Sequence, residues 1–426
     1  MQNYSSMDKT ALAEEYKKLS ETYAAYKAQG LSLNMARGKP GAAQLDVSND
    51  MLSVLNDKTC FVTPDCPDIR NYGNLDGIDC AKQLFADILG VDKKNVFVGG
   101  NSSLNMMFDT VACLMDQGCS GEKPWNQQGK IKFLCPAPGY DRHFGVTQYF
   151  GIEMITVPMT ENGPDMDMVE QLVSSDSSIK GIWCVPKYSN PQGITYSDET
   201  VKRFAALKPA AKDFRIMWDN AYIIHDINDT PDSLLNIFDE LKKTGNEDMV
   251  LEFCSTSKIT FPGAGVAAMA ASEANLALLK KRYNFQTIGY DKMNMLRHVL
   301  YFKDLDGVLA HMQKHRAVLE PRFKMVLDTL DKELGALQIA CWTKPNGGYF
   351  VSIDVMEGCA KRVVALCKEA GVVLTGAGAT YPYGNDPKDS NIRLAPTYPP
   401  VDELEKAMAI FCTCVKMAAI EKLSNQ

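Results

Sequence analysis

A single lysine among hydroxyl side chains is the strongest candidate for chemistry in the sequence. Lys258 directly follows Ser255, Thr256 and Ser257, and the apolar run at residues 249–253 that precedes them is typical of a strand. A lysine that only serves solubility usually lies among other charges on a helix face. Because ligand-binding residues gather at the carboxyl ends of strands in a parallel sheet, this pattern indicates an amine that acts on a ligand.

A carboxylate and a phenol follow another apolar run in the same way. Asp219 closes the run at residues 215–218, and Tyr222 follows three positions later. Burying a carboxylate without a cationic partner is unfavourable. Asp219 is therefore either a site residue with such a partner or an ordinary loop residue held by solvent.

A small-residue turn is a candidate for binding phosphate. The stretch VGGNSSLNMM, residues 98–107, ends a predicted strand and opens a predicted helix. Small residues there let backbone N–H groups and the hydroxyls of Ser102 and Ser103 approach a phosphate at a helix N-terminus. The same pattern is also typical of an ordinary N-cap, so alone it leaves both interpretations open.

Two proline-containing loops present further side chains after predicted strands. CPAPGYDRHF carries Tyr140, with Arg142 and His143 close behind it, and CVPKYSNPQG carries Asn190 before Pro191. Tyr140 could equally be an ordinary packing residue, and an asparagine before proline is often only a turn former. These residues become candidates for a ligand-binding site only in combination with Lys258, Asp219 and Tyr222.

Composition excludes several classes of protein. The chain has 426 residues and a net charge of −7. Without a long basic block, nucleic acid is not expected as a partner. No run approaches the roughly 18 apolar residues of a membrane span, and the N-terminal residues lack the apolar core of a signal peptide, so we expect a cytoplasmic protein.

The cysteines and histidines of the sequence argue against disulfide bonds and against a metal site. The 13 cysteines are scattered without a C-x-x-C pair, which favours reduced thiols in a reducing compartment. The five histidines form neither an H-x-x-H nor an H-E-x-x-H pattern, so no metal site is expected.

The order of elements predicts an α/β architecture. Short apolar runs alternate with helical stretches up to about residue 271, which implies a parallel sheet covered by helices on both faces. Beyond about residue 306, long helical stretches flank two more runs and indicate a smaller α+β domain. We expect a large domain at 50–305 and a small domain built from 1–49 and 306–426. The expected strands are 95–98, 131–135, 182–186, 215–218, 250–254, 265–271, 348–354 and 391–395, and the expected helices include 7–28, 102–118, 140–150, 198–207 and 401–422.

Taken together, these motifs resemble those of one enzyme family. Asn-Pro at 190–191, Asp-x-x-Tyr at 219–222, Ser-x-Ser-Lys at 255–258 and a late Arg393 resemble the fold-type I pyridoxal-phosphate (PLP) aminotransferases of class I/II. Within them the chain looks like the divergent bacterial aspartate aminotransferases related to MocR-type proteins. The resemblance runs from NMARGKPG to NIRLAPTYPP, nearly the whole chain. It implies PLP-dependent transferase fold type I, with a large, mostly parallel sheet between helices and a smaller α+β domain.

The resemblance implies roles for the residues around the cofactor ring. Lys258 would hold the PLP aldehyde and act as general base, and Asp219 would face the pyridine nitrogen. Tyr222 and Asn190 would hydrogen-bond the phenolic oxygen of the ring. Tyr140 would stack on the ring, and His143 would lie behind Asp219.

It also implies residues for the phosphate and the substrate. Arg393 would fork the α-carboxylate, a task suited to a planar guanidinium, with Gly38 as a backbone donor. The phosphate would be bound by Asn101, Ser102, Ser103, Ser255, Ser257 and, from a neighbouring subunit, Tyr72.

The chain departs from the family pattern after the lysine. Many members carry an arginine there that neutralises the phosphate, whereas this sequence has none between Lys258 and residue 281. Phosphate binding is therefore expected to depend more on hydroxyls, backbone N–H groups and Tyr72.

The function implied is transfer of an amino group between an amino acid and a 2-oxo acid by a ping-pong mechanism, in a homodimer with shared active sites. Aspartate or glutamate is the expected donor, with Arg142 or Arg37 on the distal carboxylate. Two alternatives stay open: a PLP-dependent C–S β-lyase, and a non-catalytic PLP-binding domain of a regulator. The few residues before NMARGKPG argue against the latter, because a winged-helix domain would not fit there.

Overall fold

An eight-stranded sheet dominates the computed structural model, which describes residues 3–425. Five central strands run parallel, whereas β9 is antiparallel to both of its neighbours and β5 is antiparallel to β4. The sheet is therefore mostly parallel, as predicted. Its order is β2 (Val96–Val98), β9 (Ala267–Ala271), β8 (Val250–Ser255), β7 (Arg215–Asp219), β6 (Ile179–Cys184), β3 (Lys132–Ala137), β4 (Glu153–Thr160) and β5 (Gly163–Pro164).

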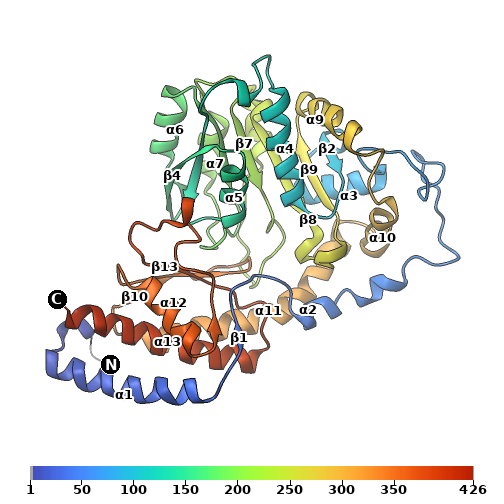
Figure 1. Ribbon diagram of the computed structural model, residues 1–426. Helices are drawn as coiled ribbons and strands as arrows, with labels where there is room; N and C mark the ends of the chain where they lie inside the picture. Colours follow the sequence, from blue (N-terminus) through green and yellow to red (C-terminus); the bar gives the residue numbers. More distant parts are fainter. Residues whose placement is uncertain (1–2, 426) are drawn as a thin grey trace.

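Alternating side chains of the strands build a core on each face of this sheet. On β7, Ile216 and Trp218 pack into one apolar cluster, whereas Met217 packs into another. The strands are buried on both faces because helices cover both (Figure 1). These helices are α3 (Asp79–Leu89), α4 (Ser103–Gln117), α5 (Asp141–Tyr149), α6 (Met166–Ser175), α7 (Asp198–Ala205), α8 (Ile237–Thr244), α9 (Glu273–Gln286) and α10 (Lys292–Phe302).

The two ends of the chain share a third apolar cluster. Leu12 of the first helix and Ile420 of the last both belong to it, and Figure 1 shows these helices side by side. This part also contains a three-stranded antiparallel sheet and a two-stranded parallel one. The division at residues 49 and 305 stays a prediction. The elements are α1 (Lys9–Ala28), β1 (Leu33–Asn34), α2 (Ala42–Asp46), α11 (Leu305–Leu334), β10 (Ala340–Trp342), β11 (Val351–Val355), α12 (Ala360–Glu369), β12 (Val372–Val373), β13 (Asn391–Leu394) and α13 (Val401–Ser424).

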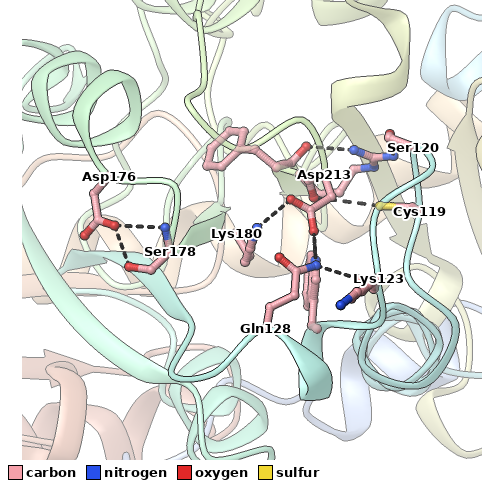
Figure 2. Close-up of polar contacts among 11 residues, drawn as sticks. Cys119, Ser120, Lys123, Gln128, Asp176, Ser178, Lys180 and Asp213 are labelled. Atoms are coloured by element: carbon pink, nitrogen blue, oxygen red, sulfur yellow. Dashed lines mark hydrogen bonds and ion pairs between the residues drawn. The ribbon is translucent and has the colours of Figure 1, made fainter.

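An ionic cluster whose carboxylate oxygens are all paired lies at the amino ends of β6 and β7 (Figure 2). Lys180 Nζ lies 2.7 Å from Asp213 Oδ1, and both side chains are buried. Trp125 Nε1 and Gln128 Nε2 donate to the other carboxylate oxygen, at 3.0 and 2.8 Å. Every oxygen of this buried carboxylate is therefore paired, as buried charges require.

Most expected elements of the sheet are present within a few residues of their predicted bounds. The run at 265–271 is a strand, but β9 is antiparallel rather than part of a uniformly parallel sheet. No helix within residues 3–425 has the length and apolarity needed to cross a membrane.

Candidate active site

A cavity of about 500 Å³ opens where β7 and β8 end and where α4 and α5 begin. Asn101 and Tyr72 do not line it, although the Asn101 carbonyl accepts from Ser257 Oγ at 3.4 Å. The other predicted site residues all contribute to its wall. They are Arg37, Gly38, Ser102, Ser103, Tyr140, Arg142, Asn190, Asp219, Tyr222, Ser255, Ser257, Lys258 and Arg393.

Lys258 lies in a short 3₁₀ turn, Thr256–Lys258, that leaves the end of β8. Its Nζ lies over the Tyr222 ring, 4.9 Å from the centroid. Burial lowers the pKa of Lys258, and the charge of Asp219 opposes that shift. Because a lower pKa leaves more of the amine unprotonated near neutral pH, Lys258 is better suited to attack an aldehyde than a surface lysine is.

Asp219 ends β7 with one oxygen paired and the other free. Its Oδ2 lies 2.9 Å from His143 Nε2, and the His143 ring stacks on Trp183 with centroids 4.4 Å apart. Oδ1 is buried and has no hydrogen-bond partner among the described residues. An unpaired buried carboxylate oxygen at a cavity wall needs a donor from a ligand, and a protonated pyridine nitrogen is such a donor.

The N-terminus of α4 faces the cavity without a side-chain cap. Ser102 is the N-cap residue but accepts no capping hydrogen bond, and Ser102, Ser103 and Leu104 line the cavity. The first N–H groups of a helix lack intrahelical partners and attract anions. On the other side, Ser255 Oγ donates to Ser257 Oγ at 3.0 Å. These groups fit a phosphate.

The stretch after Lys258, which has no arginine through residue 281, contains a valine that packs into the core. Val266 is only 2% exposed, and its N–H donates to Thr256 Oγ1 at 2.9 Å. The valine thus packs inward and ties the lysine turn to the chain that returns into β9. Because no arginine follows Lys258 through residue 281, N–H groups and hydroxyls would hold a bound phosphate.

Arg393 extends from β13 into the opposite wall of the cavity. Its Nη1 lies 3.1 Å from both Asp141 Oδ1 and Asn190 Oδ1, and its Nη2 donates to Thr375 Oγ1 at 3.2 Å. The guanidinium also lies over the Phe350 ring. Its Nε is buried and unpartnered among the described residues. This group has donors suited to a carboxylate.

Sequence reasoning missed Asp141, Thr375 and Phe350, which surround that arginine. Asp141 directly follows Tyr140, so its place in the loop was a usable signal. Phe350 explains Gly38, because a Cβ at that glycine would collide with the aromatic ring. Nothing in the sequence around residue 375 marks Thr375 as a neighbour of Arg393.

The chain matches known aminotransferases along its whole length. The family model described as Aspartate amino-transferase matches residues 7–426. A protein of Mycolicibacterium smegmatis named as an aminotransferase is 45% identical over 423 residues, covering 99% of each chain. An aspartate aminotransferase of Corynebacterium glutamicum is 46% identical over 400 residues, covering 94% of this chain and 92% of that one. The crystal structure of an aspartate transaminase from Corynebacterium glutamicum superposes with a TM-score of 0.95 at 44% identity, covering 98% and 99%.

Proposed function

Because the chain belongs to the aspartate aminotransferase family of PLP-dependent enzymes, we propose that it transfers the amino group of aspartate or glutamate to a 2-oxo acid such as 2-oxoglutarate. It is an aminotransferase, and its cofactor is PLP. The observation that carries the choice of dicarboxylate substrates is that the wall around Lys258 has further arginines besides the one assigned to the α-carboxylate. Arg37, Arg142 and Arg393 all line the cavity.

The cofactor would be held by residues whose free donors and acceptors match its groups. Asp219 Oδ1 would accept from the ring nitrogen, and the N–H groups at the start of α4 would bind the phosphate. Tyr140 would stack on the ring, and Asn190 and Tyr222 would hydrogen-bond its phenolic oxygen; all three line the cavity. Burial raises the pKa of Tyr140 to about 12, so this phenol stays protonated and uncharged at neutral pH.

The chemistry at the substrate falls to Lys258 and Arg393. When bound, the cofactor supplies an electron sink that acidifies the Cα–H bond of the amino acid. Arg393 holds the α-carboxylate, which takes the place of Asp141 on the guanidinium. Lys258 is the general base that removes the Cα proton, and its lowered pKa matches that task. Amino acid and 2-oxo acid then use the same groups in turn, which gives ping-pong kinetics.

Arg142 is the proposed partner of the distal carboxylate. Losing a charge-assisted pair in a partly enclosed site costs roughly 2–5 kcal/mol. Arg142→Ala should therefore reduce kcat/KM for aspartate by more than about tenfold and spare an apolar or aromatic donor. Arg37→Ala tests the other candidate in the same wall, and a loss selective for aspartate in that variant instead would move the distal carboxylate to Arg37. Equal losses for dicarboxylic and aromatic donors would make Arg142 structural, and a wild-type preference for aromatic donors would remove the dicarboxylate assignment.

The C–S β-lyase alternative uses nearly the same residues and has a direct test. A lyase releases pyruvate from a cysteine conjugate without any 2-oxo acid acceptor. We expect no such release that is independent of acceptor. The comparisons favour transamination, because the relatives named above are aminotransferases or transaminases.

A second subunit is proposed to complete the phosphate site. Tyr72 is 82% exposed and lies outside the cavity, which suits a residue that serves a neighbouring subunit. We expect a dimer by light scattering. Tyr72→Phe should weaken PLP binding, measured as the dissociation constant of the cofactor, because no arginine follows Lys258 to compensate. A monomer with full activity at assay concentration would contradict this assembly.

A cytoplasmic location is proposed from the thiols. All 13 cysteines are free, and ten of them are buried. Such usage suits a reducing compartment. Fractionation of cells that express the chain, with a secreted marker as control, tests this location.

A further inference from the structure

Three of the five histidines lie within hydrogen-bond distance of residues 256–260, the segment around Lys258 that we call the lysine turn. His298 Nε2 lies 3.1 Å from Thr256 Oγ1 and 3.0 Å from Thr260 Oγ1. His311 and His315 contact the Ile259 carbonyl, directly after the lysine. The mechanism above uses none of the three.

His311 and His315 converge on one atom. They are four residues apart on α11, so they share one face of that helix. Each Nε2 lies 2.8 Å from the Ile259 oxygen, and the two Nε2 atoms lie 3.1 Å apart. Both side chains are buried. A carbonyl oxygen has two lone pairs and can accept from both rings.

The surroundings fix which nitrogen of His315 carries the proton. Gln44 Nε2 lies 3.4 Å from His315 Nδ1 and donates to Tyr349 Oη at 2.8 Å. An amide nitrogen only donates, so His315 Nδ1 accepts and Nε2 carries the hydrogen that Ile259 receives. Burial lowers the pKa of His315 to about 4, so the ring is neutral at physiological pH.

We propose that His311 and His315 are positioning residues for Lys258, which hold the lysine turn from helix α11. The carbonyl of Lys258 itself accepts from Tyr349 Oη at 3.4 Å, so two successive carbonyls of the turn are held by groups outside it. Fixing these two peptide planes fixes the direction in which the Lys258 side chain leaves the backbone. The inference rests on the proposed role of Lys258 and adds residues from a distant part of the chain to it.

The neutral charge state of His315 matters for Lys258 as much as the position of the ring does. A protonated His315 would place a positive charge one residue from Lys258 and would disfavour any protonated form of the lysine nitrogen. Gln44 blocks that state, because its amide presents a donor to Nδ1. A glutamate at position 44 would instead accept from a protonated Nδ1 and raise the pKa of His315.

The first experiment compares three variant holoenzymes with the wild type. In His315→Phe the donor to Ile259 is lost, and we expect kcat to fall about tenfold or more, with KM for the amino donor changed less than about twofold. The pH midpoint of the cofactor's visible absorption band should shift as well. His315→Gln offers an amide N–H to the same carbonyl and should recover most of both values. Met312→Leu, on the same helix and buried, is the matched control and should behave as wild type.

A His315→Phe enzyme with wild-type kcat and midpoint overturns the proposal, as does a loss that His315→Gln does not recover. Should His315→Phe fail to fold, Gln44→Glu decides: its midpoint should move to lower pH, and an unchanged midpoint overturns the proposal. Borohydride reduction followed by peptide mapping is run on the wild type first. Label on a residue other than Lys258 would overturn the role of that lysine, and the positioning role with it.

Discussion

Two lysines at opposite ends of the large sheet differ in how their charges are balanced. At the amino end of β6, Lys180 pairs with Asp213, and all oxygens of that carboxylate are bonded. At the carboxyl end of β8, Lys258 has aromatic faces near its amine, and Asp219 keeps one buried oxygen free. The first cluster is complete without a ligand, whereas the second lacks partners that a ligand can supply. Unsatisfied polar groups, rather than buried charge alone, distinguish the functional end.

Lys258→Met should separate activity from stability more sharply than any other change. The substitution removes the amine that attaches the cofactor and takes the Cα proton, so transamination should fall by at least about 10²–10⁴-fold. No ion pair of the described residues includes this lysine, so the free energy of unfolding should stay the same or rise. Coupled transamination assays and urea denaturation measure the two effects. A Lys258→Met variant with wild-type activity would show that Lys258 is not the functional lysine of the sheet.

Lys180→Met should show the opposite behaviour. It leaves the Asp213 carboxylate buried without its cation, which destabilises the fold by about 3–5 kcal/mol. Urea denaturation of the apoprotein measures the loss, and the cofactor's absorption spectrum in the folded holoenzyme should stay that of wild type. Lys132→Met is the matched control, because its pair with Asp176 is partly exposed and should contribute at most about 1 kcal/mol. A stability loss no larger than in this control would mean that the Asp213 cluster does not hold the amino end together.

Short motifs predicted the chemistry of the carboxyl end because each depends on residues close together in sequence. Ser-x-Ser-Lys and Asp-x-x-Tyr each follow a strand, and strand ends meet at one edge of a parallel sheet. The pairing of Arg393 with Asp141 was beyond such reasoning, because it joins positions 252 residues apart. The contact of His315 with the Ile259 carbonyl could not be predicted for the same reason, because these residues lie 56 positions apart.

The direction of β9 could have been predicted and was not. A parallel neighbour of β8 needs a crossover of about a dozen residues or more, usually a helix. The segment between Ser255 and Ala267 contains only two short 3₁₀ turns, so the chain reverses and β9 returns antiparallel. The lysine lies in this reversal. The same short connection that breaks the parallel pattern therefore brings Lys258 to the end of the sheet.

The last prediction concerns acid stability between pH 6.5 and 4, to which His298 at the carboxyl end of the sheet should contribute. Burial lowers the pKa of His298 to about 4, from an ordinary value of 6.5. Below pH 6.5 His298 binds a proton in the unfolded chain but not in the folded chain. The free energy of unfolding is therefore highest above that pH. It falls as the pH drops toward about 4, by up to about 1.4 kcal/mol per pH unit for this one histidine.

His298→Gln removes the titrating group and keeps a side-chain amide for the hydroxyls of Thr256 and Thr260. Its unfolding free energy should therefore fall less steeply between pH 6.5 and 4 than that of wild type, even if it is lower at neutral pH. Lys132→Met should keep the wild-type slope, because it removes only a partly exposed ion pair at the other end of the sheet and no histidine. Urea denaturation at a series of pH values measures all three slopes. If His298→Gln and wild type have equal slopes, the acid sensitivity does not arise at the lysine turn, and the two ends of the sheet do not differ in this respect.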